Sequence, residues 1–454
     1  MGFLEHSDNH RDIFPPSAMT DAVETIGDGR TALEQAALSD VGLRRGNNQD
    51  SFAVALAGDD ADWHRRGHLL MVADGMGAHA AGELASKMAC ESVPHTYRKS
   101  LDRSPADALR HAVLTANASI HDRGQANAEF QGMGTTCSAL VLLPRYALIA
   151  HVGDSRVYRL RGGKLEQLTF DHSLVWEMMA AGQMPRGEVA SFIPKNIITR
   201  SLGPHADVQV DLEGPFALEI GDTFLLCSDG LSGQLKDEEI GALLATLSPS
   251  EAVRVMVDVS NLRGGPDNIT AIVARVASVP AEASGDSPTA AVPQAAPGVH
   301  PAWWGAMAVC LAVGLILAIG RYYVAALVSV LLGAASAVAA LVQGMSPPAS
   351  AAQSTPEGPL GRGPHATFDC APGAASAAVA AQLAAQLREA TRNEHWTLDW
   401  GHFNSLGEEA QAALDRGDYS GAVRNYALSI SFMMNEIRVQ AAKKDHRDNS
   451  VLDK

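Results

Sequence analysis

The sequence predicts a globular domain of mixed α and β structure, followed by an apolar stretch and a small helical region. Short runs of Leu, Met, Val and Phe bounded by turn residues, such as "LLMVADG" ending at Gly75, indicate buried strands. Two uncharged stretches, Trp303–Gly320 and Val324–Val342, each approach the length that crosses a bilayer. The later segment "AAVAAQLAAQLREATRN" consists of strong helix formers.

At 454 residues the chain is too long for one ordinary domain. Composition shifts mark the boundaries. We expect a flexible tail at 1–33, a globular domain at 34–279, a Pro- and Ala-rich linker at 280–301, membrane segments at 302–343, a second linker at 344–371 and a helical region at 372–447.

Charge and cysteine usage exclude several classes of protein. The net charge of −16 argues against a general affinity for nucleic acid, which requires basic stripes. The charged start of the chain does not resemble a secretion signal. The cysteines are scattered and form no CxxC, so we expect neither a disulfide framework nor a structural zinc site. They are Cys90, Cys137, Cys227, Cys310 and Cys370.

The apolar stretch predicts a transmembrane helical hairpin, with membrane contact through residues 303–342. Trp303 opens the first apolar run and Arg321 separates the two, as interfacial anchors would. A buried helical pair in a soluble domain is the alternative. A hairpin returns the chain to the side it left, and the flanking Lys and Arg residues are too sparse to set the orientation. From the chemistry of the globular domain, described below, we expect the chain at the inner membrane, with that domain facing the cytoplasm.

The helical region contains a pattern that resembles one tetratricopeptide repeat. Small residues at fixed spacing would let paired helices approach closely, and aromatic residues would fill the space between them. The pattern residues are Leu406, Gly407, Ala410, Gly417, Tyr419, Ala422 and Tyr426. A generic helical hairpin explains the pattern nearly as well. Either structure suits a protein partner, bound through residues 400–440, better than catalysis.

Three aspartates carry the strongest chemical signal in the sequence. Asp74 and Asp229 each close an apolar run as part of Asp-Gly, and Asp267 stands just before another apolar run. A carboxylate at the end of a buried strand is costly unless a positive charge neutralises it. Three of them at one sheet edge would form an oxygen cage for a divalent cation, with Mg²⁺ or Mn²⁺ preferred.

Together with these aspartates, the motifs "GLRRGNNQDSF", "DGMGAHAAGEL", "GMGTTCSALVLL", "IAHVGDSRVYRLRGGKLEQLT" and "DHSLVWEMMAAG" occur in the order found in one family. From about Gln35 to Val276 the chain resembles the type 2C, metal-dependent serine/threonine protein phosphatases, in particular the bacterial members. The resemblance implies an α+β fold, a four-layer α-β-β-α sandwich of two antiparallel sheets flanked by helices. It also implies a centre of two Mn²⁺ or Mg²⁺ ions in a cleft at one end.

The resemblance also assigns roles to individual residues. It implies that Asp74 bridges both metals and that the Gly75 carbonyl binds one of them. Asp229 and Asp267 would complete the second metal. Elementary chemistry agrees with these roles, because two such ions can activate a water for direct attack on phosphorus, with no Cys or Ser nucleophile.

Further residues follow from the same resemblance. Asp154 would hold a third, weaker metal with Asp229. Asp50 would bind a metal ion, either directly or through a water molecule. Arg45 matches the arginine that grips the substrate phosphate, as a guanidinium can with two parallel hydrogen bonds. The animal enzymes have a His directly after Asp-Gly as proposed general acid, where this chain has Met76. His79 is the nearest substitute, and a metal-bound water is the alternative.

This chain departs from the family pattern at Gln49, where many relatives have Glu, and at Ala78, where a Gly is usual. Asn268 and Thr270 are expected to order the Asp267 loop. The stretch 171–200 corresponds to the variable flap of the family and is expected to shape substrate choice, with possible contacts from its methionines. These are Met178, Met179 and Met184.

The sequence therefore predicts a membrane-anchored serine/threonine protein phosphatase that acts on phosphorylated cytoplasmic proteins. A cognate Ser/Thr kinase is expected from family habit alone. The first rival is a non-catalytic, phosphatase-like scaffold whose helical C-terminus binds partners. A metal-dependent hydrolase of small phosphorylated molecules is the second rival. All of the metal carboxylates are present, which favours the enzyme.

Overall fold

A computed structural model describes residues 18–20, 33–77, 80–182, 197–279, 359–392 and 398–452, with isolated positions between 312 and 331. The chain divides into two compact units. One unit combines Met1–Pro280 with Thr355–Lys454, and the other is Ala281–Ser354. The predicted globular domain and the C-terminal helices thus belong to the same unit. The predicted domain boundaries themselves stay predictions.

One sheet of the first unit has seven antiparallel strands in the order β1-β2-β12-β11-β8-β9-β13. These strands are β1 Ala18–Thr20, β2 Leu33–Asp40, β8 Arg156–Arg161, β9 Lys164–Gln167, β11 Thr223–Cys227, β12 Ile269–Val276 and β13 Ala366–Asp369. The two edge strands come from unexpected places. β1 lies in the predicted N-terminal tail, and β13 lies in the segment predicted to be the second linker.

The other sheet has the order β10-β7-β6-β4-β3, with β5 paired to β4. These strands are β3 Asp50–Ala55, β4 His68–Met76, β5 Gly134–Thr135, β6 Cys137–Leu142, β7 Tyr146–Val152 and β10 Asp211–Ala217. The strand pairs in both sheets are antiparallel, as the sequence predicted.

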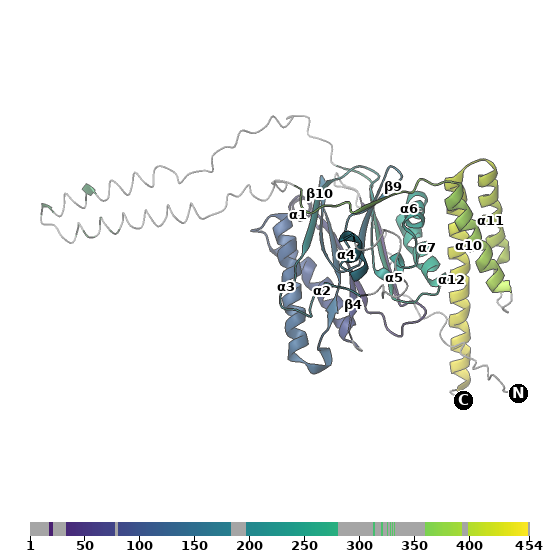
Figure 1. Ribbon diagram of the computed structural model, residues 1–454, viewed down its shortest axis with the longest axis horizontal. Coiled ribbons are helices and arrows are strands. Elements are labelled where there is room, and N and C mark those ends of the chain that lie inside the picture. The colour runs from purple at the N-terminus through teal and green to yellow at the C-terminus, as the bar shows by residue number, and fades with distance from the viewer. Residues whose placement is uncertain are drawn as a thin grey trace. The chain divides into compact units, whose positions relative to one another are not determined.

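Helices cover both outer faces of the sheets (Figure 1). The helices of the first unit are α1 Asp60–Arg66, α2 Ala81–Lys99, α3 Pro105–Ala126, the 3-10 turn η1 Ala128–Phe130, α4 Leu174–Ala180, α5 Asp229–Ser232, α6 Asp237–Thr246, α7 Pro249–Leu262, α10 Ala374–Arg392, α11 Trp400–Asp415 and α12 Tyr419–Leu452. Helices α2 and α3 pack on the six-stranded sheet, and α6 and α7 pack on the seven-stranded sheet. This arrangement agrees with the predicted sandwich.

Alternation along the strands builds the layers. Side chains of successive residues in a strand point to opposite faces. Leu70 and Val72 of β4 therefore meet Phe224 and Leu226 of β11 in the core between the sheets. Met71 points the other way, into the core under α2 and α3. Central strands such as β4 and β6 are buried on both faces, and a buried face fixes the register of a strand.

The C-terminal helices add a further layer over α6 and α7, and share one apolar core with them (Figure 1). Ion pairs support this contact. Arg424 of α12 pairs with Glu251 of α7 at 2.5 Å, and Arg438 pairs with the fully buried Asp258. Helices α11 and α12 form a hairpin, whereas the likeness to a tetratricopeptide repeat stays a prediction.

The prediction of a transmembrane hairpin is wrong on the structural finding. Within the described residues, no helix has both the length and the apolar character to cross a membrane. A span requires about 20 consecutive apolar residues in one helix, and apolar composition alone does not establish such a helix. Most of the predicted hairpin, 302–343, lies outside the described residues.

Candidate active site

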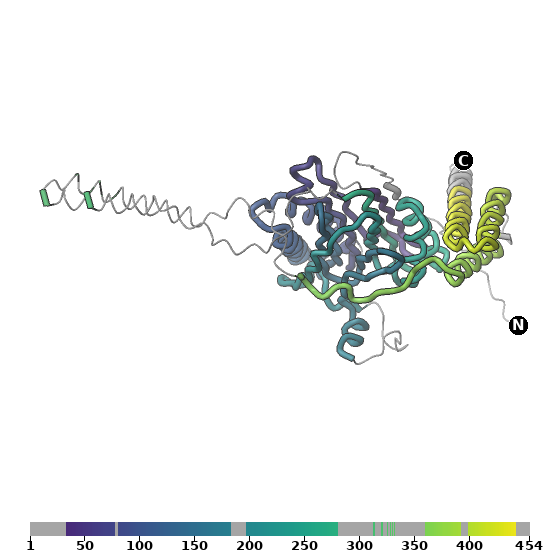
Figure 2. The backbone as a smooth tube through the Cα atoms, turned by 90° about the horizontal axis from the view of Figure 1, so that it is seen from above, coloured from purple at the N-terminus to yellow at the C-terminus, as the bar shows by residue number. Residues whose placement is uncertain are grey.

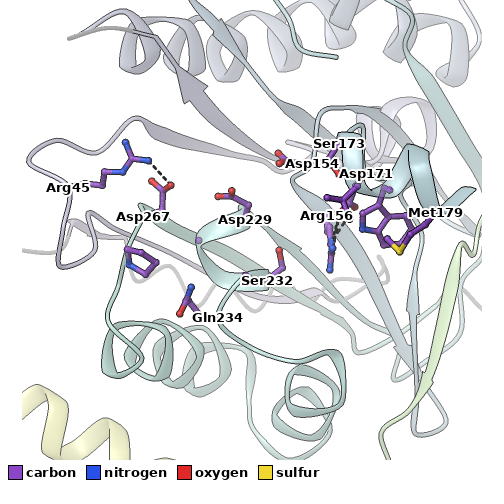
Figure 3. A pocket seen from close by; sticks show the side chains of 15 residues that line it. Arg45, Asp154, Arg156, Asp171, Ser173, Met179, Asp229, Ser232, Gln234 and Asp267 are labelled. Carbon is purple, nitrogen blue, oxygen red and sulfur yellow. Dashed lines mark hydrogen bonds and ion pairs between the residues drawn. The ribbon is translucent and has the colours of Figure 1, made fainter. Parts of the chain in front are cut away.

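Strand ends from both sheets bring five aspartates to one end of the sandwich. Asp50 of β3 lies directly opposite Asp74 of β4 in the register. Asp229 follows the end of β11 and begins α5, Asp154 follows β7, and Asp267 precedes β12. We call these five residues the acidic wall. Asp154, Asp229 and Asp267 line a pocket of ≈ 490 Å³ (Figure 3).

Arg45 and Asp267 face each other at the rim of this pocket (Figure 3). An Arg45 Nη2–H group donates to Asp267 Oδ2 at 2.7 Å, while the Arg45 side chain is 49% exposed. The loop before β12 is fixed by Asn268, whose side chain accepts from the Gln49 amide and donates to the Val41 carbonyl. Asn268 therefore orders the loop that carries Asp267, as the sequence suggested.

Burial and mutual repulsion raise the pKa of four carboxylates of the acidic wall, those of Asp50, Asp74, Asp154 and Asp229. Burial raises the pKa of Asp50 to about 7 and that of Asp154 to about 8, and the charge of Asp229 adds to both shifts. Burial, followed by the charges of Asp50 and Asp229, raises the pKa of Asp74 well above its usual value. Burial and then Asp267 raise the pKa of Asp229. The site carries more negative charge than its surroundings neutralise.

The unpaired oxygens of this wall suit a hard cation. One oxygen each of Asp50, Asp154 and Asp229 is buried and has no hydrogen-bond partner among the described residues. Buried polar atoms normally have partners, and oxygen-only donors favour Mg²⁺ or Mn²⁺. In the described part of the chain, no three Asp, Glu, His or Cys side chains form a group that could hold an ion by themselves. Backbone carbonyl and water ligands would have to complete the shell.

The glycines after Asp74 have a clear steric role. A Cβ on Gly75 would lie 2.1 Å from the Gly82 carbonyl oxygen and 2.5 Å from that of Gln49, so no side chain fits there. Gly77 has φ +148°, a conformation that other residues rarely adopt. The predicted general acid, His79, lies outside the described residues, as does Ala78.

The opposite side of the pocket carries a feature that the sequence reading missed. Arg156 donates to both carboxylate oxygens of Asp171, through Nε at 2.9 and 3.1 Å and through Nη2 at 2.7 Å. Its guanidinium also lies over the Trp176 ring of α4, 5.5 Å from the centroid. We call Arg156, Asp171 and Trp176 the flap wall. One feature of the sequence could have indicated this residue. Arg156 follows Asp154 by two positions and begins a strand.

Sequence comparison identifies relatives for just over half of the chain. The sequence model of the family Protein phosphatase 2C matches residues 44–261. Protein phosphatase PhpP of Streptococcus pneumoniae is 38% identical over 244 residues, which cover 52% of this chain and 95% of that protein. The matched residues of the family model include four of the five aspartates and end before Asp267.

Solved structures give the same grouping. The serine/threonine phosphatase Stp1 from Staphylococcus aureus is 32% identical, with a TM-score of 0.50, over 54% of this chain and 96% of that one. The catalytic domain of the serine threonine protein phosphatase PstP, solved in complex with two manganese ions, is 33% identical. That match covers 54% of this chain and 99% of the other, with a TM-score of 0.47.

Proposed function

This chain belongs to the protein phosphatase 2C family, and we propose that its pocket hydrolyses phosphoserine and phosphothreonine esters on proteins. It is an enzyme of the protein-serine/threonine phosphatase class. One observation of the structure carries the proposal. Five aspartates from distant parts of the chain gather at one end of the sandwich, where three of them line the pocket. Asp50, Asp154 and Asp229 each keep a buried oxygen without a hydrogen-bond partner among the described residues.

Two divalent ions, Mn²⁺ or Mg²⁺, would be held at the acidic wall. Asp74 and the Gly75 carbonyl would bind there together with Asp229 and Asp267, and Asp154 would add a third, weaker position. When bound, ions of this kind lower the pKa of water and neutralise the charge that develops on a phosphoryl group. The raised pKa values of the carboxylates support this role, because a cation would relieve the repulsion that raises them.

Arg45 would bind the phosphoryl oxygens of the substrate. Its guanidinium is half exposed at the rim and uses Nη2 to hold Asp267. The exposed half of this side chain suits a tetrahedral anion, since a guanidinium pairs with two phosphate oxygens at once. Arg45 would thus place phosphorus beside the acidic wall and keep Asp267 in position.

Asp50 would orient water rather than contact the substrate. One of its oxygens accepts from the Ser228 hydroxyl at 2.7 Å, and that hydroxyl accepts from the Thr270 amide at 3.0 Å. The second oxygen of Asp50 has no hydrogen-bond partner among the described residues. A fixed carboxylate with one free oxygen can accept a proton or align a water. Three expectations stay predictions: that His79 is the general acid, that a cognate kinase exists, and that the chain acts in the cytoplasm.

The experiment that tests this function is metal-dependent phosphate release by the full chain. Protein freed of metal should release phosphate from a phosphothreonine peptide only after Mn²⁺ or Mg²⁺ is added, and excess chelator should abolish the release. A phosphorylated sugar or nucleotide, added as a competitor, should not suppress peptide hydrolysis. Activity that survives the chelator would contradict the metal centre. Preference for the small phosphate would contradict a protein substrate.

A further inference from the structure

The segment that leads into the C-terminal helices pairs with the outer strand of each sheet of the sandwich. We call residues 359–370 the strap, shown in green in Figure 2. Leu360 pairs with Gly214 of β10, with hydrogen bonds of 2.5 and 3.1 Å between their backbones. Six residues later, β13 pairs with β9 of the other sheet. The strap therefore joins the outer strand of one sheet to that of the other, beyond the part of the chain that the family model matches.

A buried carboxylate of β10 anchors the strap. Glu213 accepts hydrogen bonds from the backbone amides of Arg362 and Gly363 at 2.9 and 2.8 Å, and from His365 Nε2 at 2.9 Å. The fit is tight, because a Cβ on Gly361 would lie 2.0 Å from a Glu213 oxygen. Hydrogen bonds to a buried carboxylate are among the stronger ones in proteins. The position of His365 is thereby fixed.

From His365, a row of rings leads to the flap wall. The His365 ring meets the edge of Phe170 at 5.6 Å between centroids, and Phe170 meets Trp176 at 5.5 Å with an interplanar angle of 88°. Edge-to-face pairs at this separation attract each other beyond simple burial. Trp176 in turn lies under the Arg156 guanidinium. The strap thus contacts, through one intervening ring, a residue that lines the pocket.

A second connection runs through the backbone of β9. The His365 amide donates to the Gln167 carbonyl at 2.8 Å. The side chain of Gln167, fully buried, donates to Asp171 at 2.8 Å, and Asp171 pairs with Arg156. Without β13, β9 would be the edge of its sheet, and edge strands lack the second set of backbone bonds that fixes position.

We propose that the strap is a positioning element of the active site, and that His365 holds the flap wall through Phe170 and Trp176. Helix α4, which carries Trp176, has only seven residues. A helix of that length is not stable by itself and takes its position from tertiary contacts. The strap supplies such a contact from outside the residues that the family model matches. This inference rests on the proposed function only for its kinetic consequence.

That consequence concerns substrates larger than the phosphoryl group. Val175, Trp176 and Met179 give this side of the pocket an apolar surface. A phosphopeptide would contact it next to the modified residue, whereas a small aryl phosphate would chiefly meet the acidic wall and Arg45. Loosening α4 should therefore raise KM for the peptide and leave turnover of the small substrate nearly unchanged.

The test uses the full chain with His365→Ala and His365→Phe. Loss of the ring contact in His365→Ala should speed amide hydrogen exchange in α4 by about threefold to tenfold. It should raise the KM for a phosphothreonine peptide by a similar factor. The kcat and the KM for p-nitrophenyl phosphate should stay within about twofold. His365→Phe keeps a ring against Phe170. Both the exchange rate in α4 and the peptide KM should therefore return most of the way to the values of the unaltered chain. Arg424→Ala, which loosens α12 without touching the strap, is the matched control and should leave α4 exchange unchanged.

Exchange and kinetics separate the possible failures. Unchanged α4 exchange in His365→Ala would overturn the inference, whatever the activity. Equal behaviour of the Ala and Phe variants would show that the ring contact does not position the wall. A parallel loss with both substrates would indicate general destabilisation and would also overturn it. If the unaltered chain cleaves no phosphopeptide, the proposed function fails, while the exchange measurement still decides the role of the strap.

Discussion

The two walls of the pocket are supported by different parts of the chain. The acidic wall stands at strand ends between the paired sheets, and its supporting residues, such as Ser228 and Asn268, lie within 34–279. The flap wall includes one residue of a seven-residue helix, held through Phe170 by His365 of the strap. The proposed catalytic groups thus rest on contacts within the predicted globular domain. The surface that we propose to meet the rest of a substrate contacts a segment beyond it.

The largest effect that we expect comes from the acidic wall. Asp229→Asn should lower kcat for a phosphothreonine peptide by at least about 100-fold, because it removes a charge from the proposed metal shell. The fold should not suffer. Since burial and neighbouring carboxylates disfavour the charge of Asp229, the melting temperature in chelator should stay the same or rise. Initial rates at saturating Mn²⁺ and thermal melts would measure both quantities.

A matched control uses the same chemical change far from the pocket. Asp102 lies exposed between α2 and α3, so Asp102→Asn should leave both kcat and melting temperature unchanged. If Asp229→Asn retained most of its turnover at saturating Mn²⁺, the assignment of the acidic wall as the catalytic wall would be wrong.

The next prediction asks whether the strap can be separated from the helices that follow it. Asp258 of α7 is buried and accepts from Ser431 at 2.7 Å and from Arg438. Arg438→Ala would leave this carboxylate without its cation and should lower the free energy of unfolding by about 3 kcal/mol. Arg438→Lys keeps a charge and should lose less. Urea unfolding would measure the difference.

In the same two variants the KM for a phosphopeptide should remain at the value of the unaltered chain, as long as the assay temperature lies below the melting transition. The contacts of Glu213 and His365 are far along the chain from Arg438 and do not include it. A KM that rises in step with the loss of stability would show that α12, and not the strap alone, supports the flap wall.

A smaller effect should follow from the flap wall itself. Trp176→Ala removes the ring that joins Phe170 to Arg156 and should raise the peptide KM about tenfold. Trp176→Phe keeps an aromatic face and should cost less. The kcat for p-nitrophenyl phosphate should change little in either variant. A large drop in that kcat would mean that the flap wall takes part in the chemistry, and the division between the walls would have to be abandoned.

How much of this could be predicted from the sequence differs between the walls for a physical reason. Asp74, Asp229 and Asp267 could be predicted from local patterns, since an Asp next to a buried apolar strand lies where that strand ends. Asp50 and Asp154 were expected only from the resemblance to the phosphatase family. Asp50 opposite Asp74 is the direct outcome of such a register. The residue types predict a metal site with oxygen ligands only. The exact ligand set does not, because Asp267 also pairs with Arg45.

The flap wall could not be predicted in this way. The support that we propose for it comes from the strap, whose glycines and prolines are typical of a linker, and β13 is only four residues long. Its role arises from pairing with β9, which no local pattern specifies. The prediction of a transmembrane hairpin over 302–343 was wrong for the converse reason. Hydropathy is a local property, and a membrane helix also needs continuous helical structure, which the described residues do not show.

The last prediction concerns a histidine behind the flap wall. His151 of β7 is fully buried, and its Nε2–H donates to the Phe170 carbonyl at 2.9 Å, while Nδ1 faces the Ser138 hydroxyl at 2.9 Å. Burial, followed by the neighbouring His172, lowers the pKa of His151 to about 3. The folded chain therefore keeps this ring neutral at pH values where an unfolded chain would protonate it.

Acid should consequently destabilise the fold through His151. Between its ordinary pKa of about 6.5 and its folded value, this histidine binds one proton more in the unfolded chain than in the folded one. The contribution of His151 to the free energy of unfolding therefore falls by at most ~1.4 kcal/mol per pH unit as pH drops. His151→Gln can still donate to Phe170 and should flatten this slope, whereas His95→Gln on the exposed side of α2 should not. The raised pKa values of Asp50 and Asp154 act with the opposite sign over this range. They are common to the variants and the unaltered chain, so the difference between their slopes, measured by urea unfolding in chelator between pH 6.5 and 4, isolates the effect of His151. Below that range Asp211 also contributes, since His172 and Arg200 outweigh burial and lower the pKa of Asp211 to about 2. An equal slope in His151→Gln and the unaltered chain would mean that the folded ring is already protonated, and that the support of Phe170 is ionic.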